Sequence, residues 1–481
     1  MKTTRVLGPA VFLLAQLLFQ PLVAAAEKYY TPVNKLLEVK DILDDPEPFY
    51  TKCNYYKDFI PQQVWDQIVT DEQKSKEVWE QAVGLKAPDL VGKIAPEIKP
   101  GPYTLADKAK YPFKDLMIPV VYQMWNEPGT EGQPNHFGCF TEVEVIPTQQ
   151  LWHGLPVAEA TLKNMGQTKQ DAQGYMVLDS YKAGFPFPRP SGDHMGLQLL
   201  YNWKKRKVAP DSSLQYDLTL GIDSRWNIDH RGIADYYWLR TQGRVQYPPL
   251  GWLDERAEKA QEEMIQTYIV LAPRDLYGNV YNITFYGDPH KESNFLAYVN
   301  LLRRVRKLSS SDRQDQAVGQ DMCYDDADGF AQDLTPDRYP YEYKIIEERE
   351  FLFPAYTLEG KSWFDSKEKF KWKELKLERR PCWVVEMIQK DSNYIYSKRI
   401  AYFDKETLWP LYFAYYDQKG RLYRDVLYEW GFVKPLGYYN YFNVLNRDFI
   451  DVHSTFTRGL GYPALWLNRD DMSLREMMKA K

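Results

Sequence analysis

The chain has 481 residues with a formal net charge of −5 at pH 7, and 44% of its residues are hydrophobic. This composition is typical of a globular protein, and the negative charge argues against a general binder of nucleic acid or of anionic membranes. The chain also contains 37 Tyr and 14 Trp residues. Because these side chains combine an apolar body with a polar tip, they favour surfaces that are both apolar and wettable.

The first 26 residues predict a cleaved export signal. A basic start with Lys2 and Arg5 precedes an apolar stretch over residues 11–19, and a run of small residues ends at Ala26. No later stretch reaches the roughly 18 apolar residues that are needed to cross a bilayer. We therefore expect a periplasmic protein that is cleaved after Ala26 and has no membrane span in its mature chain.

The chain after the signal is predicted to have three parts. Residues 27–135 form an N-terminal helical and irregular region, because short apolar faces at helical spacing alternate with Pro. Residues 136–456 form the main β domain, which also contains a helix that begins near Asp193. Residues 457–481 form a C-terminal tail.

From Tyr216 onward the main domain consists mostly of predicted strands. Runs such as YDLTLGI, ADYYWLR, MIQTYIVLA and NVYNITFYG are rich in β-branched and aromatic residues, and hairpin-length gaps separate them. Few helical crossovers interrupt these runs, which indicates antiparallel pairing. The predicted fold class is therefore α+β with one large antiparallel sheet.

The even number of cysteines suggests disulfide bonds. Their spacing is too wide for a zinc site of the C-x-x-C kind. In an exported protein four cysteines favour two disulfides in any of three pairings, and free buried thiols are the alternative. The candidate disulfide residues are Cys53, Cys139, Cys323 and Cys382.

Signatures of catalysis and metal binding are missing from the sequence. The six His residues show no zinc-binding spacing, and neither a G-x-S-x-G motif nor a phosphate-binding glycine loop occurs. The acidic loop Asp325–Asp328 suggests a calcium loop, but Tyr324 and Thr335 would stand at its first and twelfth positions, where neither is a suitable ligand. We therefore predict no enzyme activity, no metal and no cofactor. The basic run Arg303–Lys307 is interpreted as an exposed or loop-paired strand, without affinity for nucleic acid.

One stretch, YFDKETLWPLYFAYYDQKGRLYR over residues 402–424, is apolar on both faces of its predicted strand. Antiparallel meander strands usually have one apolar face and one polar face. A two-residue turn at residues 405–406 would pair Tyr402 with Trp409. The unusual feature to explain is why this strand has no polar face.

The order of turns in this stretch resembles that of the lipoprotein carriers LolA and LolB. It runs strand, D-x-x-T with Pro soon after, strand, D-x-x-G and strand. More specifically, much of the chain between about Gly184 and Arg424 resembles a family of exported proteins of unknown function described as outer-membrane lipoprotein-sorting-like. The matching segments are AGFPFPRP, LLYNW, LLRRVRKL, DDADGF, DRYPYEYKIIEEREFLFP, RRPCWVVEM and YSKRIAYFDKETLWPLYFAYYDQKGRLYR.

The resemblance implies a LolA/LolB-like fold, in which a strongly curved antiparallel sheet forms an open half-barrel around helices and has an apolar cavity. A strand of such a sheet would face the cavity on one side and packed segments on the other. The alternative is that both faces of the strand are core. The chain departs from the true carriers in being more than twice as long as a typical single carrier domain, and it lacks the lipid-anchoring Cys of LolB.

The resemblance and the missing catalytic motifs favour a periplasmic carrier or binding protein for a lipid or other hydrophobic ligand. A carrier needs only a shielded apolar pocket, since each methylene exposed to water costs about 0.8 kcal/mol. Members of the family are often associated with RND-type transporters, so such a transporter or an outer-membrane protein is the expected partner. The alternatives are a non-carrying accessory subunit of an envelope transport complex and an exported hydrolase.

Six residues are predicted to line the cavity, because strand alternation places the bulkier side chains of the hairpin on one face. The opposite face would carry Ala401, Pro410 and Ala414. The predicted lining residues are Trp383, Val385, Tyr402, Trp409, Leu411 and Phe413.

Overall fold

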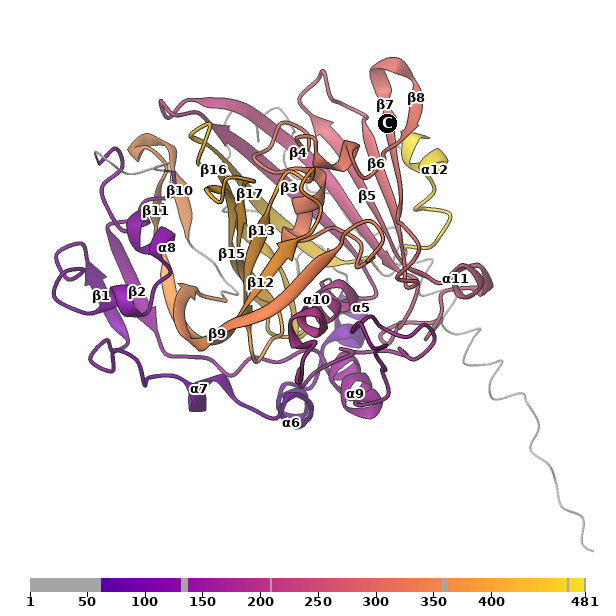
Figure 1. The fold of residues 1–481 in the computed structure, drawn as a ribbon, viewed down its shortest axis with the longest axis horizontal. Coiled ribbons are helices and arrows are strands. Elements are labelled where there is room, and N and C mark those ends of the chain that lie inside the picture. Colours follow the sequence, from indigo (N-terminus) through magenta and orange to yellow (C-terminus); the bar gives the residue numbers. More distant parts are fainter. Residues whose placement is uncertain (1–61, 131–136, 208–209, 357–361, 465–466, 480–481) are drawn as a thin grey trace, which may run out of the picture.

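The computed structural model describes residues 62–130, 137–207, 210–356, 362–464 and 467–479 (Figure 1). The predicted signal peptide and Cys53 lie outside these residues. None of the described helices is long and apolar enough to cross a membrane.

One sheet of 15 strands organises the described chain, and it is mostly antiparallel and not closed (Figure 1). Its strand order is β1-β2-β12-β13-β14-β15-β16-β17-β3-β4-β5-β6-β7-β8, and β9 pairs with β12 outside this path. Among the described strands, β2 and β12 make the one parallel pair. The strands of this sheet are β1 Gly101–Thr104, β2 Glu142–Ile146, β3 Ser212–Ile222, β4 Ile228–Arg240, β5 Glu262–Ala272, β6 Val280–Tyr286, β7 Asn294–Val299, β8 Arg304–Lys307, β9 Tyr341–Pro354, β12 Lys376–Gln389, β13 Lys398–Asp404, β14 Pro410–Tyr416, β15 Leu422–Val433, β16 Tyr438–Asp448 and β17 His453–Pro463.

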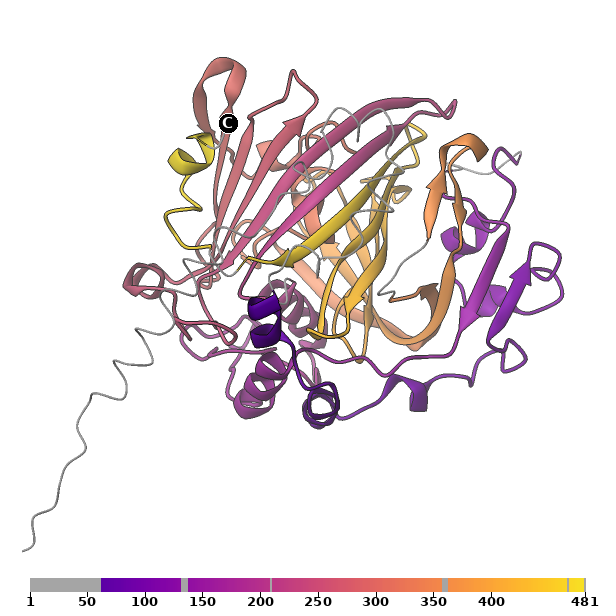
Figure 2. The ribbon, with the colours of Figure 1, turned by 180° about the vertical axis from the view of Figure 1, so that it is seen from behind.

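The remaining elements are short. Strands β10 Trp363–Asp365 and β11 Lys371–Lys373 form a separate two-stranded sheet. Helices α5, α6, α9 and α10 gather at one end of the large sheet (Figure 1 and Figure 2). The helices are α5 Gln62–Ile68, α6 Glu72–Val83, α7 Ala87–Leu90, α8 Pro119–Met124, α9 Leu155–Asn164, α10 Met195–Arg206, α11 Glu255–Ala260 and α12 Leu474–Lys479, with 3-10 turns η2 Phe113–Asp115, η3 Asn300–Leu302, η4 Asp312–Gln314, η5 Tyr324–Gly329 and η6 Ser366–Glu368.

The predicted large antiparallel sheet is confirmed, and it extends beyond the predicted main domain at both ends. Strands β12 to β17 follow one another as hairpins, and β17 then pairs with β3, which joins the two halves of the sheet. Strand β1 comes from the predicted N-terminal region, and β17 crosses the predicted boundary after residue 456.

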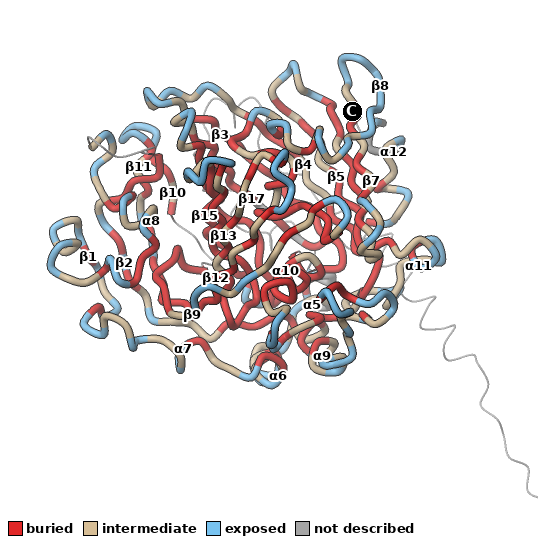
Figure 3. The backbone as a smooth tube through the Cα atoms, in the orientation of Figure 1, coloured by how far each residue is buried: buried red, intermediate tan, exposed pale blue. Residues whose placement is uncertain are grey.

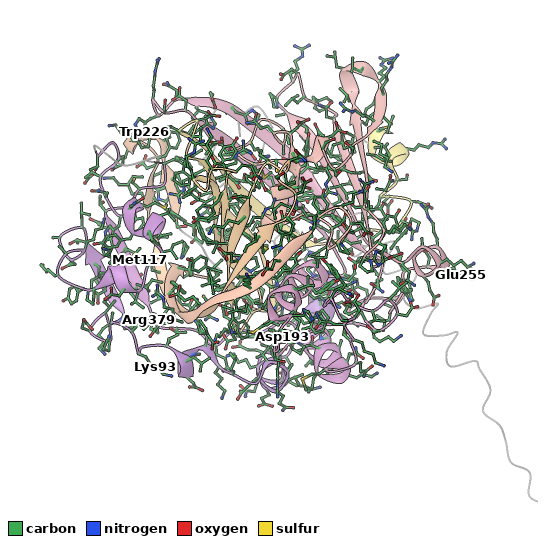
Figure 4. The ribbon with its side chains drawn as sticks, in the orientation of Figure 1. Lys93, Met117, Asp193, Trp226, Glu255 and Arg379 are labelled. Atoms are coloured by element: carbon green, nitrogen blue, oxygen red, sulfur yellow. The ribbon has the colours of Figure 1, made fainter. Side chains whose placement is uncertain are left out.

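The segment 92–98 of the N-terminal region is tied to the sheet by a buried ion pair. Arg379 on β12 donates to three backbone carbonyls of this segment. Glu350 on β9 accepts three of its backbone N–H groups and lies 3.1 Å from Arg379. Figure 4 labels Arg379 beside Lys93 of this segment. Because both charges are buried, loss of either partner would leave an unpaired charge in the interior.

A single helix, α10, contacts strands that are far apart in the strand order. These contacts show that the large sheet curves around α10. At its start, Gly196 packs against Tyr343 on β9 and Val385 on β12. At its end, Lys205 forms an ion pair with Glu263 on β5. The side of the sheet that faces α10 is called the concave face below.

The opposite, convex face is covered by residues 137–140 and by β10. A Cβ atom built on Gly138 would lie 2.8 Å from Leu445 of β16 and 3.3 Å from Phe364 of β10. The rings of Phe137 and Phe364 also contact Phe456 of β17 in a tilted arrangement. The central strands are therefore covered on both sides, and Figure 3 shows them as buried.

The hairpin β13–β14 has a different register from the predicted one. Tyr402 pairs with Tyr412, whereas a pairing with Trp409 was predicted. The physical reason is a wider turn: Asp404 accepts the backbone N–H groups of Glu406 and Thr407, so the chain does not reverse at two residues. The predicted register is therefore wrong.

Candidate functional site

A cavity of about 110 Å³ lies against the concave face of strands β3 to β7. The other side of the cavity is formed by residues 317–328, which we call the covering segment, and by residues of β15, β16 and β17. The lining residues are Gln215, Asp217, Tyr236, Gln266, Tyr268, Tyr281, Ile283, Phe295, Ala317, Val318, Gln320, Met322, Tyr324, Asp326, Ala327, Asp328, Tyr428, Tyr441, Val444, Asn446 and Thr457.

A row of tyrosines across three neighbouring strands forms much of the wall. Tyr236 on β4 pairs with Tyr268 on β5, and Tyr268 pairs with Tyr281 on β6. Directly paired residues of antiparallel strands point to the same face of the sheet, which brings the three rings together. Gln215 on β3 pairs with Tyr236 and extends the row with a polar group.

The covering segment is held in place by ion pairs next to the cavity. Asp326 accepts from Arg399 of β13 at 3.0 Å, and both side chains are almost fully buried. Asp321 contacts His453 of β17 at 2.7 Å through the ring Nδ1. These contacts tie the segment to two separate strands of the sheet.

Asp328 is neutralised within a hydrogen-bond network at the cavity wall. Its Oδ2 accepts from Lys207 Nζ at 2.7 Å, and its Oδ1 accepts from Tyr441 OH at 2.9 Å. Tyr236 OH and Gln266 Nε2 donate to Oδ2 at 3.4 Å and 3.3 Å. The charge of Asp328 is therefore balanced by a cation behind the wall.

Asp217 has a different environment. Its Oδ1 accepts from Gln215 Nε2 at 2.6 Å, and among the described residues it has no ion-pair partner. Burial, together with the nearby carboxylates of Asp328 and Asp235, raises the pKa of Asp217 to about 7. This carboxyl group can therefore be neutral or charged near neutral pH, depending on what occupies the cavity.

None of the six predicted lining residues belongs to the wall of this cavity. Val385 and Phe413 lie on the concave face, because both stand in one cross-strand row with Ala401, which was predicted on the other face. Trp383 shares this side by strand alternation, and Leu411 is the unpaired residue of a β-bulge between Pro410 and Tyr412. Here the concave face is packed against Gly329 and α10, so these residues are core.

The remaining two predicted residues lie in other surroundings. Tyr402 is on the convex face, where its ring contacts Phe351 and Phe353. Trp409 packs against Trp203 of α10 and Trp430 of β15. The strand that is apolar on both sides thus has core on both sides, which was the alternative explanation.

Residues Cys139, Cys323 and Cys382 are buried free thiols, so the predicted disulfides do not form among them. Cys139 lies in the segment on the convex face and Cys323 within the covering segment on the concave face, so the sheet separates them. Burial raises the pKa of all three thiols, to about 11 for Cys139. Buried thiols of this kind are unreactive.

The acidic loop around Asp325 and Asp326 pairs with arginines. Asp325 lies 2.8 Å from Arg313, and Asp326 pairs with Arg399 as described above. Within the described residues no group of three or more His, Cys, Asp or Glu side chains is placed to hold a metal. The structure therefore uses these carboxylates to fix the covering segment.

A second, larger hollow of about 470 Å³ lies near the start of α10. Its rim carries charged side chains that already pair with one another, since Glu342 accepts from both Lys344 and Lys390. We regard the smaller tyrosine-lined cavity as the candidate site, because its wall combines apolar surface with a few convergent polar groups.

The cavity residues were missed at the level of sequence because they come from distant parts of the chain. Tyr236, Tyr268 and Tyr281 each lie in a run that was correctly read as a strand. Only the pairing of these strands shows that the three rings meet. The abundance of Tyr was the one available signal.

Comparisons with known proteins place the chain in a family. A family profile described as "Protein of unknown function (DUF1329)" matches residues 130–455. A comparison with curated proteins found no match.

The chain also matches solved structures of proteins from several bacteria. A candidate outer membrane lipoprotein-sorting protein domain from Vibrio parahaemolyticus is 14% identical with a TM-score of 0.42, and the match covers 60% of this chain and 100% of that one. A DUF1329 family protein from Desulfovibrio piger is 13% identical with a TM-score of 0.43, covering 59% and 98%. A LolA superfamily protein from Nitrosomonas europaea is 13% identical with a TM-score of 0.33, covering 55% and 90%.

Proposed function

The chain belongs to the DUF1329 family of proteins of unknown function, and from its cavity we propose that it binds a hydrophobic or amphipathic small molecule in the cell envelope without catalysing a reaction. The observation that carries this proposal is the row of tyrosine rings on the concave face, enclosed by the covering segment. Aromatic surface with few polar groups is typical of ligand pockets. Export to the periplasm, and service to an RND-type transporter or an outer-membrane protein, are part of the same proposal.

The size of the cavity limits what it holds in the present conformation. A volume of about 110 Å³ lies between that of one water molecule and that of an engineered cavity of about 150 Å³ which binds benzene. It therefore has room for a small headgroup, whereas an aromatic ring needs somewhat more space. Carriage of a whole acyl chain would require the covering segment to move away from the sheet.

Binding of the neutral dye N-phenyl-1-naphthylamine tests the proposal; because the dye is larger than the present cavity, its binding also requires the covering segment to move. Tyr281→Trp enlarges a half-buried side chain of the cavity wall and should weaken dye binding by partly filling the space. Tyr237→Trp is the matched control, because Tyr237 on β4 is also half-buried but lies outside the cavity wall. Equal dye affinity in wild type and both variants would contradict binding at this cavity.

Native mass spectrometry of protein purified from its own envelope tests carriage directly. A co-purifying mass in the lipid range is expected for a carrier. A protein that binds neither the dye nor any such molecule would favour the accessory-subunit alternative, since that role needs no ligand.

A further inference from the structure

The wall of the cavity combines aromatic rings with carboxylates. It contains six tyrosines and three aspartates, whereas no Lys or Arg occurs among the described residues that line it. Asp326 and Asp328 are balanced by Arg399 and Lys207, which lie outside the wall. The charge of Asp217 has no such partner in the described chain, so the cavity as a whole has a deficit of positive charge.

The faces of aromatic rings carry partial negative charge and attract cations within about 6 Å of the ring centre. Carboxylates buried beside such rings strengthen this attraction, because charges interact more strongly away from water. Quaternary ammonium groups are bound by aromatic cages of this kind. A neutral hydrophobic group would gain nothing from the three carboxylates.

We propose that the cavity binds an organic ammonium group, with Asp217 as its counter-ion and the rings of Tyr236, Tyr268 and Tyr281 around it. This proposal rests on the proposed function and specifies the chemistry of the ligand. The ammonium group can belong to a small free solute or to the headgroup of a lipid whose chains leave the cavity past the covering segment. No covalent step is involved.

Calorimetric titration with choline and with its neutral isostere, in which carbon replaces the nitrogen, tests the role of charge. Choline should bind at least about tenfold more tightly than the isostere. Equal affinity for the two compounds, or no binding of choline, would overturn the proposal. Dodecyltrimethylammonium, used below its micelle concentration, distinguishes the sources: tighter binding than choline indicates a lipid headgroup, and equal binding indicates a free solute.

Asp217→Asn tests the counter-ion. It should weaken choline binding about tenfold and leave binding of the neutral isostere unchanged. Asp235→Asn removes the same charge from β4 outside the cavity wall, so it should change choline affinity much less. Thermal unfolding of each variant checks that it is folded. Tyr281→Leu is a second test of the ammonium site, because it removes a half-buried ring of the wall and keeps the carboxylate of Asp217.

The outcomes separate this proposal from the proposed function. Binding of the neutral dye without binding of choline would refute the ammonium site and leave a hydrophobic pocket. Binding of choline without binding of the dye would support the ammonium site and refute a general hydrophobic pocket.

A second observation, independent of the cavity, concerns the hairpin β7–β8 at the edge of the sheet. Figure 1 shows that this hairpin projects from the rest of the fold. At its tip Leu301 and Leu302 are 84% and 64% exposed, and all of the residues Arg303–Lys307 are exposed. Arg306 pairs with Asp312, whereas no ion pair occurs at Arg303, Arg304 or Lys307 among the described residues.

We propose that this tip docks on an anionic lipid surface. Two adjacent exposed leucines beside basic side chains match the pattern of proteins that insert apolar side chains at the headgroup level and hold acidic lipids by charge. The local positive charge is compatible with the net negative charge of the chain. Salt limits the range of interactions between surface charges to about 8 Å at physiological ionic strength.

Co-sedimentation with phosphatidylglycerol vesicles tests this docking. Binding should fall about tenfold in a Leu301→Ser and Leu302→Ser double variant and should weaken with added salt. Leu250→Ser is the control, because Leu250 is 61% exposed at a different place. The proposal fails if wild type does not bind the vesicles, or if the double variant binds as well as wild type.

Discussion

A Cβ atom built on Gly329 would lie 2.3 Å from Cε2 of Phe413. Gly329 has a φ of +77°, and its carbonyl accepts a hydrogen bond from Tyr415 OH at 2.9 Å. The residue that follows the covering segment is thus fitted against the concave face of β14 with no room for a side chain. This contact explains why Phe413 lies in packed core although it is on the concave side.

Gly329→Ala should lower the free energy of unfolding by more than the cost of placing Ala in the left-handed backbone conformation. Gly420 is the matched control, because it has a φ of +76° and no atom within 4 Å of its built Cβ. Gly420→Ala therefore measures the cost of the left-handed conformation, about 1–2 kcal/mol. Overpacking should add about 1–3 kcal/mol in Gly329→Ala. Equal losses for both variants in urea unfolding would contradict the close fit.

Leu411→Ala should behave as a core substitution. Leu411 is fully buried and outside the cavity wall, so truncation should cost about 2–5 kcal/mol of stability and leave dye affinity unchanged. Ile283→Ala is the comparison, because Ile283 lines the cavity. Loss of dye affinity in Leu411→Ala without a lower thermal midpoint would restore the original assignment of this residue to a cavity.

His153 should make the protein acid-sensitive. It is fully buried, donates from Nε2 to the carbonyl of Thr407 at 3.0 Å, and packs against Trp79, Phe185 and Tyr439. Burial lowers the pKa of His153 to about 3.

In the unfolded chain the pKa of a His side chain has its ordinary value near 6.5, well above the folded value. Between the two values the unfolded chain binds a proton and the folded chain does not, so the stabilisation present above pH 6.5 is lost as the pH falls. The slope is about 1.4 kcal/mol per pH unit. His153→Gln should reduce the slope of unfolding free energy between pH 6 and 4, whereas the exposed His290→Gln should not. Identical slopes would show that His153 titrates normally.

Arg380→Met should destabilise the fold strongly. Its guanidinium lies within 2.8 Å of carboxylate oxygens of Glu378, Asp404 and Glu406, and all four side chains are at most 1% exposed. Removing one partner from a buried charge network costs about 3–5 kcal/mol.

The loss should be smaller in acid, because protonation neutralises the remaining carboxylates; burial already raises the pKa of Glu406 to about 7. Arg421→Met is the control, since the Arg421–Asp417 pair is exposed on the Arg421 side and such pairs contribute at most about 1 kcal/mol. A loss for Arg380→Met that is as small as the control, or one that does not change between pH 8 and pH 5, would contradict the network.

Thiol titration checks the cysteines. Without reductant, the native protein should react slowly, because Cys139, Cys323 and Cys382 are buried. At least three thiols should react once the chain is unfolded. Fewer than three reactive thiols under denaturing, non-reducing conditions would restore the disulfide interpretation.

The sequence alone was sufficient for the strand-rich fold class and for the family. Antiparallel hairpins are encoded locally: strand runs and the turn residues at Asp404 and Asp417 are neighbours in the chain, so both could be read directly. The register of β13–β14 could not be read from the sequence. The side chain of Asp404 widens the turn by hydrogen bonds that the spacing of residues does not reveal.

The cavity was decided by the tertiary structure. Its wall combines Asp217 from β3, tyrosines from β4 to β6, the covering segment 317–328 and Thr457 from β17. These parts meet because β17 pairs with β3, which brings two strands that are far apart in the chain side by side. A strand's own residues specify that it has two faces. Which face encloses a cavity and which is packed as core depends on the segments that lie against it, and α10, Gly329 and residues 137–140 come from elsewhere in the chain.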